Sequence, residues 1–151
     1  MSDAPFHLPH FLPYLLNQAA EAAGQEFQAY YRGRYGMLRT EWRVLFHLGC
    51  YGPLSARRIC EMASIHKTKV SRAVAALEAK RYLARSQMAD DRRVEDLSLT
   101  PVGRVVFEDL SGAAARFETR LVDGLTPEEL RVLRRGLLKL SHLPDAPDRP
   151  F

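Results

Sequence analysis

Residues 54–103 decide the fold, and they read LSARRICEMASIHKTKVSRAVAALEAKRYLARSQMADDRRVEDLSLTPVG. The first part predicts a short helix that begins at Leu54-Ser55, with the hydroxyl of Ser55 as its N-cap. A turn at residues 64–66 separates it from a second helix over about residues 67–80. The apolar residues of this second helix recur at steps of three and four, the spacing of one buried face: Val70, Ala73, Val74 and Leu77. The pattern favours a helix–turn–helix.

A β-hairpin is predicted directly after the second helix. Residues 82–87 form a plausible strand, and residues 89–92 are polar and turn-like. In residues 94–100, Leu97 and Leu99 alternate with polar residues, which indicates a half-buried strand. A charged hairpin in this place would give the same module a second point of contact with a partner.

The solvent side of the second helix carries Lys, Arg, Ser and Thr. An α-helix of this kind fits the major groove of DNA, where such side chains donate to base edges and phosphates. Thr68, Lys69 and Arg72 are the strongest candidates to face the groove. The start of the preceding helix is suited to phosphate, and an arginine at the hairpin tip to a minor groove. The predicted DNA-binding residues are Ser55, Arg57, His66, Lys67, Thr68, Lys69, Ser71, Arg72, Asp91, Arg92 and Arg93.

The positive charge of the chain is confined to this segment. Residues 54–93 hold ten Lys and Arg against four acidic residues, whereas residues 1–53 hold four of each and residues 94–151 hold eight against ten. Such an uneven distribution is expected where a polyanion docks on one part of a protein, although a solvated basic face would give the same count.

Long amphipathic helices are predicted on both sides of the helix–turn–helix. One runs over about residues 8–34 and is ended by Gly33 and Gly36, and a shorter one begins at Thr40 as its cap. Thr100 caps a helix that reaches Gly124, and Thr126 caps the last one. The element order is therefore α-α-α-α-β-β-α-α, in a mainly α (α+β) chain of 151 residues.

The cysteines, the N-terminal residues and the apolar runs indicate the redox chemistry, the metal content and the location of the protein. Cys50 and Cys60 fall on predicted helices and are interpreted as small buried hydrophobes, although a redox role stays open. No spacing of Cys and His suggests a metal site, and no cofactor is expected. The N-terminal residues lack the pattern of a secretory signal, and no apolar run is long enough to span a membrane, so we expect a cytoplasmic protein.

The region resembles the winged helix–turn–helix of the multiple-antibiotic-resistance regulator (MarR) family. The resemblance is carried by residues 39–45 (RTEWRVL), by the helix pair of residues 54–78, and by Asp91 and Arg93 followed by residues 97–103 (LSLTPVG). The last group matches the family's wing signature, Asp-x-Arg and then Leu-x-Leu-Thr-x-x-Gly. Arg81 departs from the pattern, because the family usually has glycine there. We expect Arg81 either to take a strained left-handed conformation or to end the helix differently.

The resemblance implies a homodimer that binds a pseudo-palindromic operator in double-stranded DNA. Residues 1–36 and 101–143 would be dimerisation helices, residues 37–100 the winged DNA-binding domain, and residues 144–151 a flexible tail. Family members commonly release DNA when a small aromatic or amphipathic ligand enters a crevice between the dimer helices and the winged module. By position that crevice would include Tyr14, Arg39, Trp42 and Arg43, although Trp42 also suits a core and Arg43 a phosphate or an ion pair.

Three classes of function compete for this sequence. The favoured hypothesis is a dimeric, sequence-specific transcriptional regulator, in particular a repressor released by a ligand. The alternative is a winged-helix interaction module that binds protein or RNA. An enzyme is rejected, because the chain shows no paired carboxylates at a useful spacing, no nucleophile–base arrangement and no phosphate-cradling loop.

Overall fold

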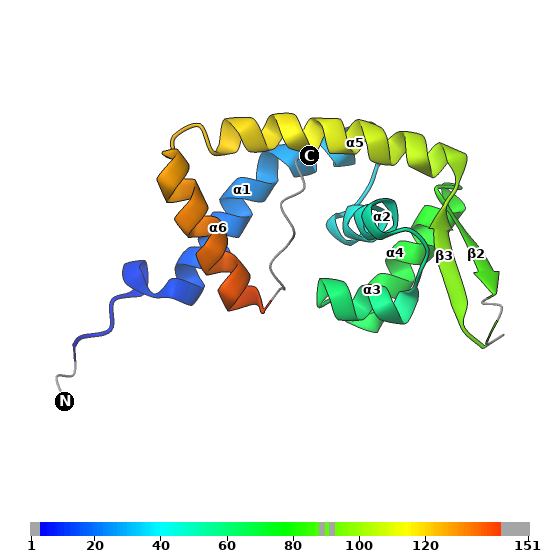
Figure 1. Cartoon of the computed structure of the whole chain (residues 1–151), viewed down its shortest axis with the longest axis horizontal. Helices are drawn as coiled ribbons and strands as arrows, with labels where there is room; N and C mark the ends of the chain where they lie inside the picture. The colour runs from blue at the N-terminus through cyan, green and yellow to red at the C-terminus, as the bar shows by residue number, and fades with distance from the viewer. Residues whose placement is uncertain (1–3, 88–89, 91–92, 143–151) are drawn as a thin grey trace.

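The computed structural model describes residues 4–87, 90 and 93–142. Long helices flank a small winged module, and Figure 1 shows α5 running along the top of the molecule from the hairpin to the loop before α6. The elements in chain order are η1 (Leu8–His10), α1 (Leu12–Tyr35), α2 (Arg39–Tyr51), β1 (Leu54–Ser55), α3 (Ala56–Ala63), α4 (Lys67–Ala79), β2 (Leu83–Gln87), β3 (Glu95–Leu99), α5 (Pro101–Leu121) and α6 (Pro127–Ser141).

The sheet has one more strand than the predicted order. Its strands lie in the order β1-β3-β2, all antiparallel. β1 pairs Leu54 with Leu97 and Ser55 with Asp96, so the start of α3 is tied to the base of the hairpin. A strand of two residues is too short to show a period of two, which is why the sequence pattern indicates only a helix start at Leu54 and Ser55. Ser55 is nevertheless the N-cap of α3, as predicted.

The core lies where α2, α4, the sheet and α5 meet. Its fully buried side chains come from all of these elements, and Phe27 and Tyr31 of α1 pack onto it. The inward residues predicted for the second helix of the pair are confirmed, since Val70, Ala73, Val74 and Leu77 are all 3% exposed or less. The largest buried side chains are Met37, Leu45, Leu48, Ile59, Leu77, Leu97 and Leu110.

The predicted cap at Thr40 is wrong, and the predicted end of the first helix is correct for one of its two glycines. Thr40 is not a cap, because α2 begins at Arg39 and the carboxylate of Glu41 accepts a hydrogen bond from the backbone N–H of Leu38 (2.6 Å). Of the two glycines expected to end the first helix, Gly36 does so in a left-handed conformation (φ 61°), whereas Gly33 lies inside α1. Thr100 and Thr126 cap α5 and α6 as predicted.

Arg81 takes the left-handed conformation (φ 61°), the first of the two outcomes expected for it. It follows the end of α4, and the backbone N–H groups of Arg81 and Tyr82 return to the carbonyls of Glu78 and Leu77 (both 2.9 Å). The hydroxyl of Thr100 donates to the Arg81 carbonyl (2.6 Å), which fixes the turn against the start of α5. The arginine therefore occupies a helix end that usually favours glycine.

The interpretation of Cys50 as a buried hydrophobe is wrong. Cys50 is exposed near the end of α2, and Cys60 is half-buried. Partial desolvation still raises the pKa of the Cys50 thiol, which disfavours the reactive thiolate. Within the described ranges no helix has both the length and the apolar run needed to cross a bilayer.

Candidate nucleic-acid interface

The turn before α4 fixes its first residues. His66 is the N-cap, and its Nδ1 accepts a hydrogen bond from the backbone N–H of Thr68 (3.2 Å). Because Nδ1 accepts this bond, the neutral ring carries its proton on Nε2. Ser64, two residues earlier, adopts a left-handed conformation (φ 53°) that ends α3 and lets the chain reverse. His66 therefore caps α4, and its predicted role in DNA binding stays a prediction.

The side of α4 away from the core is polar, cationic and exposed: Lys67, Thr68, Lys69, Ser71 and Arg72. In the part of the chain that the structure describes, none of its three cations has an acidic partner within salt-bridge distance. Unpaired cations on one helix face are suited to an anionic partner, because no internal ion pair must break before they bind it.

The start of α3 lies beside the wing. The hydroxyl of Ser55 accepts from the backbone N–H of Arg58 (3.1 Å), so it acts as a cap. Arg57 is 89% exposed on its side chain and lies 3.4 Å from the carboxylate of Glu61. Ser55, Arg57 and Arg93 line one shallow concavity, which the β1–β3 pairing brings together. Asp91 and Arg92 lie outside the described residues, so their predicted roles stay predictions.

An ionic link connects the two strands of the hairpin to α4. The guanidinium of Arg85 on β2 bonds Glu78 of α4 (3.0 Å) and Glu95 of β3 (3.2 Å). These two carboxylates raise the pKa of Arg85, with the bond to Glu95 as the largest cause. The hairpin is thereby joined to the helix that it follows. Gly103 lets the start of α5 pack closely against the residue that precedes β2. A Cβ at Gly103 would lie only 1.9 Å from the carbonyl oxygen of Tyr82.

Sequence reasoning missed a polar cluster where α1 meets α5. Asp109 of α5 accepts hydrogen bonds from the hydroxyls of Tyr30 (3.1 Å) and Tyr35 (2.5 Å) and pairs with Arg34 (3.2 Å). The bond from Tyr35 is the first cause of a lowered pKa for Asp109. Asp109 is more than seventy positions from both tyrosines in the chain, so no local sequence pattern predicts the cluster.

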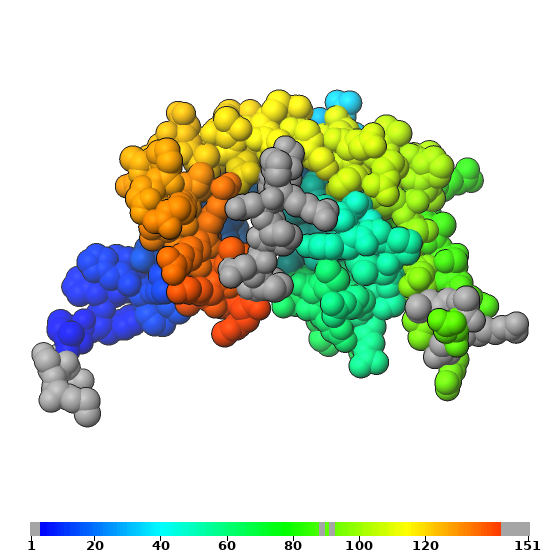
Figure 2. Space-filling model, in the orientation of Figure 1, coloured from blue at the N-terminus to red at the C-terminus, as the bar shows by residue number. Residues whose placement is uncertain are grey.

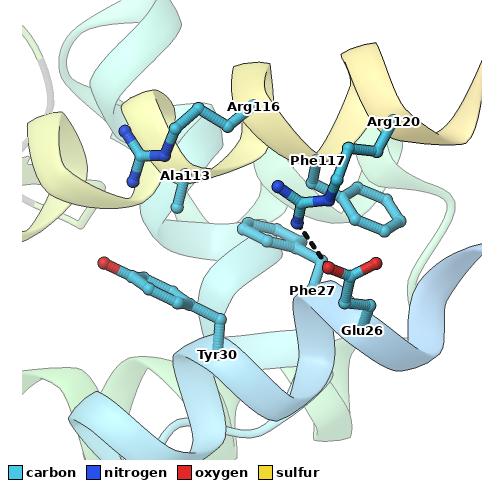
Figure 3. Close-up of a pocket in the computed structure, with 7 residues that line it drawn as sticks. All are labelled: Glu26, Phe27, Tyr30, Ala113, Arg116, Phe117 and Arg120. Carbon is cyan, nitrogen blue, oxygen red and sulfur yellow. Dashed lines mark hydrogen bonds and ion pairs between the residues drawn. The ribbon is translucent and has the colours of Figure 1, made fainter.

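The same two helices enclose a cavity of about 370 Å³ (Figure 3). The rings of Phe27 and Phe117 stack at its floor with their centroids 6.0 Å apart, and Tyr30 stands on the α1 side. An ion pair between Glu26 and Arg120 bridges the helices at one end. The lining residues are Glu26, Phe27, Tyr30, Ala113, Arg116, Phe117 and Arg120.

The structure separates the residues predicted to hold an effector. Arg39 and Trp42 line a crevice of about 80 Å³ against α1. Arg43 does not line this crevice: its guanidinium donates to the carbonyl of Ala63 (2.7 Å), and with Arg39 it lines a different concavity that faces the turn before α4. Tyr14 is near the start of α1 and accepts a hydrogen bond from Gln18 (2.8 Å). Within one described chain these four side chains do not share a cavity.

A helix–turn–helix, a β-hairpin wing and an exposed cationic helix face together define a winged-helix protein of the DNA-binding class. A model of the MarR family matches residues 35–94. The HTH-type transcriptional regulator YwaE of Bacillus subtilis (strain 168) is 31% identical over 105 residues, which are 70% of this chain and 61% of YwaE. The transcriptional repressor MdtR of the same organism is 28% identical over 116 residues, covering 77% of this chain and 75% of MdtR.

Solved structures agree over almost the full length. BpsR of Bordetella bronchiseptica, whose DNA binding is described as regulated by 6-hydroxynicotinic acid, is 26% identical with a TM-score of 0.83, covering 95% of this chain and 100% of that one. A MarR/EmrR family regulator from Acinetobacter sp. ADP1 is 26% identical with a TM-score of 0.81, covering 91% and 96%. The chain belongs to the MarR family of transcriptional regulators. Its homologues are regulators and not enzymes.

Proposed function

We propose that this protein is a cytoplasmic, dimeric repressor that binds a pseudo-palindromic operator and releases it when an aromatic ligand binds. The observation that carries the DNA-binding part is the exposed cationic face of α4 beside the wing. Thr68 and Arg72 lie at the centre of that face, opposite the buried side chains, and would meet base edges. Arg57 would contact a backbone phosphate, and Arg93 would enter the minor groove.

The dimer is supported by apolar side chains that the single chain leaves exposed. They gather on residues 6–15, around the beginning of α1, and on residues 121–140, from the end of α5 through α6. These two segments lie at the same end of the molecule in Figures 1 and 2. No residue of α6 is buried in the single chain. A surface of this extent requires a partner, and a second copy would place two α4 helices on successive major grooves about 34 Å apart. The residues are Phe6, Leu8, Phe11, Leu12, Leu15, Leu121, Leu125, Val132, Leu133, Leu137 and Leu140.

The dimer is tested by placing charge on the apolar side of α6. Leu133→Glu with Leu137→Glu should give a monomer in analytical ultracentrifugation, because two carboxylates would be desolvated at the interface. Arg135→Glu is the matched control, since Arg135 lies on the opposite face of the same helix, and it should leave a dimer. A wild-type protein that sediments as a monomer would contradict the proposal.

The ligand is best accommodated by the cavity between α1 and α5. Its volume of about 370 Å³ is within the range of small-molecule sites, whereas the crevice beside Arg39 and Trp42 holds about 80 Å³. Stacked aromatic rings would contact a planar ligand, and Arg116 or Arg120 would bind its carboxylate. The site predicted from Tyr14, Arg39, Trp42 and Arg43 is the second candidate, because a partner chain would contribute to it.

One experiment tests operator and ligand together. Duplexes bound by the full chain are selected from a random pool, and binding to them is measured again with a panel of aromatic acids that includes 6-hydroxynicotinic acid. We expect a two-fold symmetric sequence and release by at least one acid, reduced by Arg116→Gln. No binding to any duplex at low salt would favour the alternative of a protein- or RNA-binding module. Binding to DNA that no acid releases would contradict the proposal that a ligand controls the protein.

A further inference from the structure

A cationic groove runs along one side of α4, between it and the start of α2. One concavity of about 370 Å³ is lined by α2, by the turn before α4 and by Lys69, with Arg39, Thr40, Arg43, Ser64, Ile65 and His66 completing it. A second concavity of about 250 Å³ adjoins it and includes Arg72. Thr40 and Lys69 line both, so the two form one continuous surface, here named the α2–α4 groove.

Positive charge in the groove has little compensation. Arg39, Arg43 and Lys69 line the first concavity, and no acidic residue does. Arg39 lies 3.9 Å from the carboxylate of Glu21, and both side chains are about 60% exposed, which makes a weak pair. Burial, and then the charge of Arg39, lower the pKa of Arg43. A bound anion would relieve the repulsion between the two guanidinium groups.

The acidic residue of the second concavity is already engaged. Glu41 is 7% exposed, and its carboxylate accepts from the backbone N–H of Leu38 (2.6 Å) and lies 3.8 Å from Lys80. It therefore faces the far end of α4 and does not neutralise Lys69. The donors available to a ligand include the guanidinium of Arg39, the ammonium of Lys69 and the hydroxyl of Thr40.

The position of the groove on α4 suggests what it binds. With 3.6 residues per turn, Lys69 lies on the α2 side of the exposed face, beside the central pair Thr68 and Arg72. A helix in the major groove presents its centre to the bases and its flanks to the phosphates on either lip. Arg39 and Thr40 of α2 extend this flank toward one lip of the DNA.

We infer that the α2–α4 groove seats a backbone phosphate of the duplex that α4 reads, held by Arg39, Lys69 and Thr40. The inference rests on the proposed function and assigns Arg39 to DNA instead of an effector. Arg43 has a positioning role: its bond to the Ala63 carbonyl (2.7 Å) fixes the end of α3 and thereby the turn that carries His66. Two phosphates would be held in this way by each dimer.

The test is binding of the full chain to random-sequence duplex DNA by fluorescence anisotropy over a series of salt concentrations. Arg39→Gln should weaken binding on the order of tenfold at moderate salt and lower the salt slope by about 0.9 for each phosphate that is no longer neutralised. Lys69→Gln should act alike. The weakening should be the same for every duplex sequence, whereas Arg72→Ala should also reduce discrimination between selected and random duplexes. Arg135→Gln, on α6, removes the same charge far from the groove and should change neither quantity.

The outcomes separate the two proposals. If wild type binds no duplex, the proposed function and this inference both fail. If wild type binds with a steep salt dependence and Arg39→Gln and Lys69→Gln leave the slope unchanged, DNA binding stands and the groove is overturned. If Arg39→Gln abolishes only the response to an aromatic acid, Arg39 is an effector residue and the inference is again overturned. Melting temperatures of all variants are compared, and Arg39→Lys, which keeps the charge, should restore most of the slope.

Discussion

Lys80 donates a hydrogen bond from Nζ to the backbone carbonyl of Tyr35 (3.0 Å), and this bond ties the end of α4 to the end of α1. The same ammonium also donates to the carbonyl of Gly36 (2.9 Å). Because the hydroxyl of Tyr35 bonds Asp109 (2.5 Å), the end of α4 is connected through α1 to the middle of α5. The orientation of α4 therefore depends on residues that belong to the flanking helices.

Asp109→Asn should lower the free energy of unfolding by about 1–2 kcal/mol at pH 7, because two tyrosine hydroxyls and Arg34 would no longer have a charged acceptor. The folded state lowers the pKa of Asp109, so its contribution to stability is complete above the unfolded pKa of about 4 and is lost as pH falls through the folded value. Urea unfolding at one fixed protein concentration measures both effects. The difference between wild type and variant should shrink below about pH 4, and Glu108→Gln, an exposed neighbour, should show neither effect.

Arg81→Gly should stabilise the protein by about 1 kcal/mol, since Arg81 has a φ of 61° and glycine adopts this conformation without a steric penalty. The comparison is Ala75→Gly, at an exposed position inside α4, where glycine should cost about 1 kcal/mol. Thermal or chemical unfolding measures both. A loss of stability in Arg81→Gly would mean that the arginine side chain makes a contact that outweighs the backbone strain.

Gly103→Ala should be among the most destabilising single methyl additions in the chain. The new Cβ would lie 1.9 Å from the carbonyl oxygen of Tyr82, so β2 and α5 would have to separate, at a cost of about 3 kcal/mol or more. Gly33→Ala is the control, because nothing lies within 4 Å of its Cβ inside α1, and it should stabilise by about 0.5–1 kcal/mol. Equal effects of the two substitutions would contradict the close approach.

His66→Ala should cost about 1 kcal/mol through loss of the cap on α4, whereas His66→Asn should keep most of the stability, since asparagine is a good N-cap. Unfolding measures this part. Binding to duplex DNA separates a second role: if Nε2 also donates to a phosphate, His66→Asn should weaken binding although the helix remains capped. Unchanged stability in His66→Ala would show that the bond from Thr68 contributes nothing.

Much of the winged module follows from local pattern. The buried face of α4, the caps at Ser55, Thr100 and Thr126, and the two hairpin strands each rest on side chains a few positions apart, so period and cap chemistry are enough to predict them. The start of α2 is harder to predict, because the backbone N–H of its N-cap Leu38 is bonded by the side chain of Glu41. The end of α1 is harder to predict because two nearby glycines, Gly33 and Gly36, could each end the helix.

The sequence by itself determined the cationic helix, the wing that follows it and the wide apolar stripes that leave α6 without a buried residue in a single chain. Only the tertiary structure decided which distant groups meet. It paired Asp109 with Tyr35, placed Arg43 against the end of α3, and set Arg39 beside Lys69 on the groove at α4. Local periodicity reports which side of a helix is buried, whereas the contacts across that side depend on how helices far apart in the chain pack together.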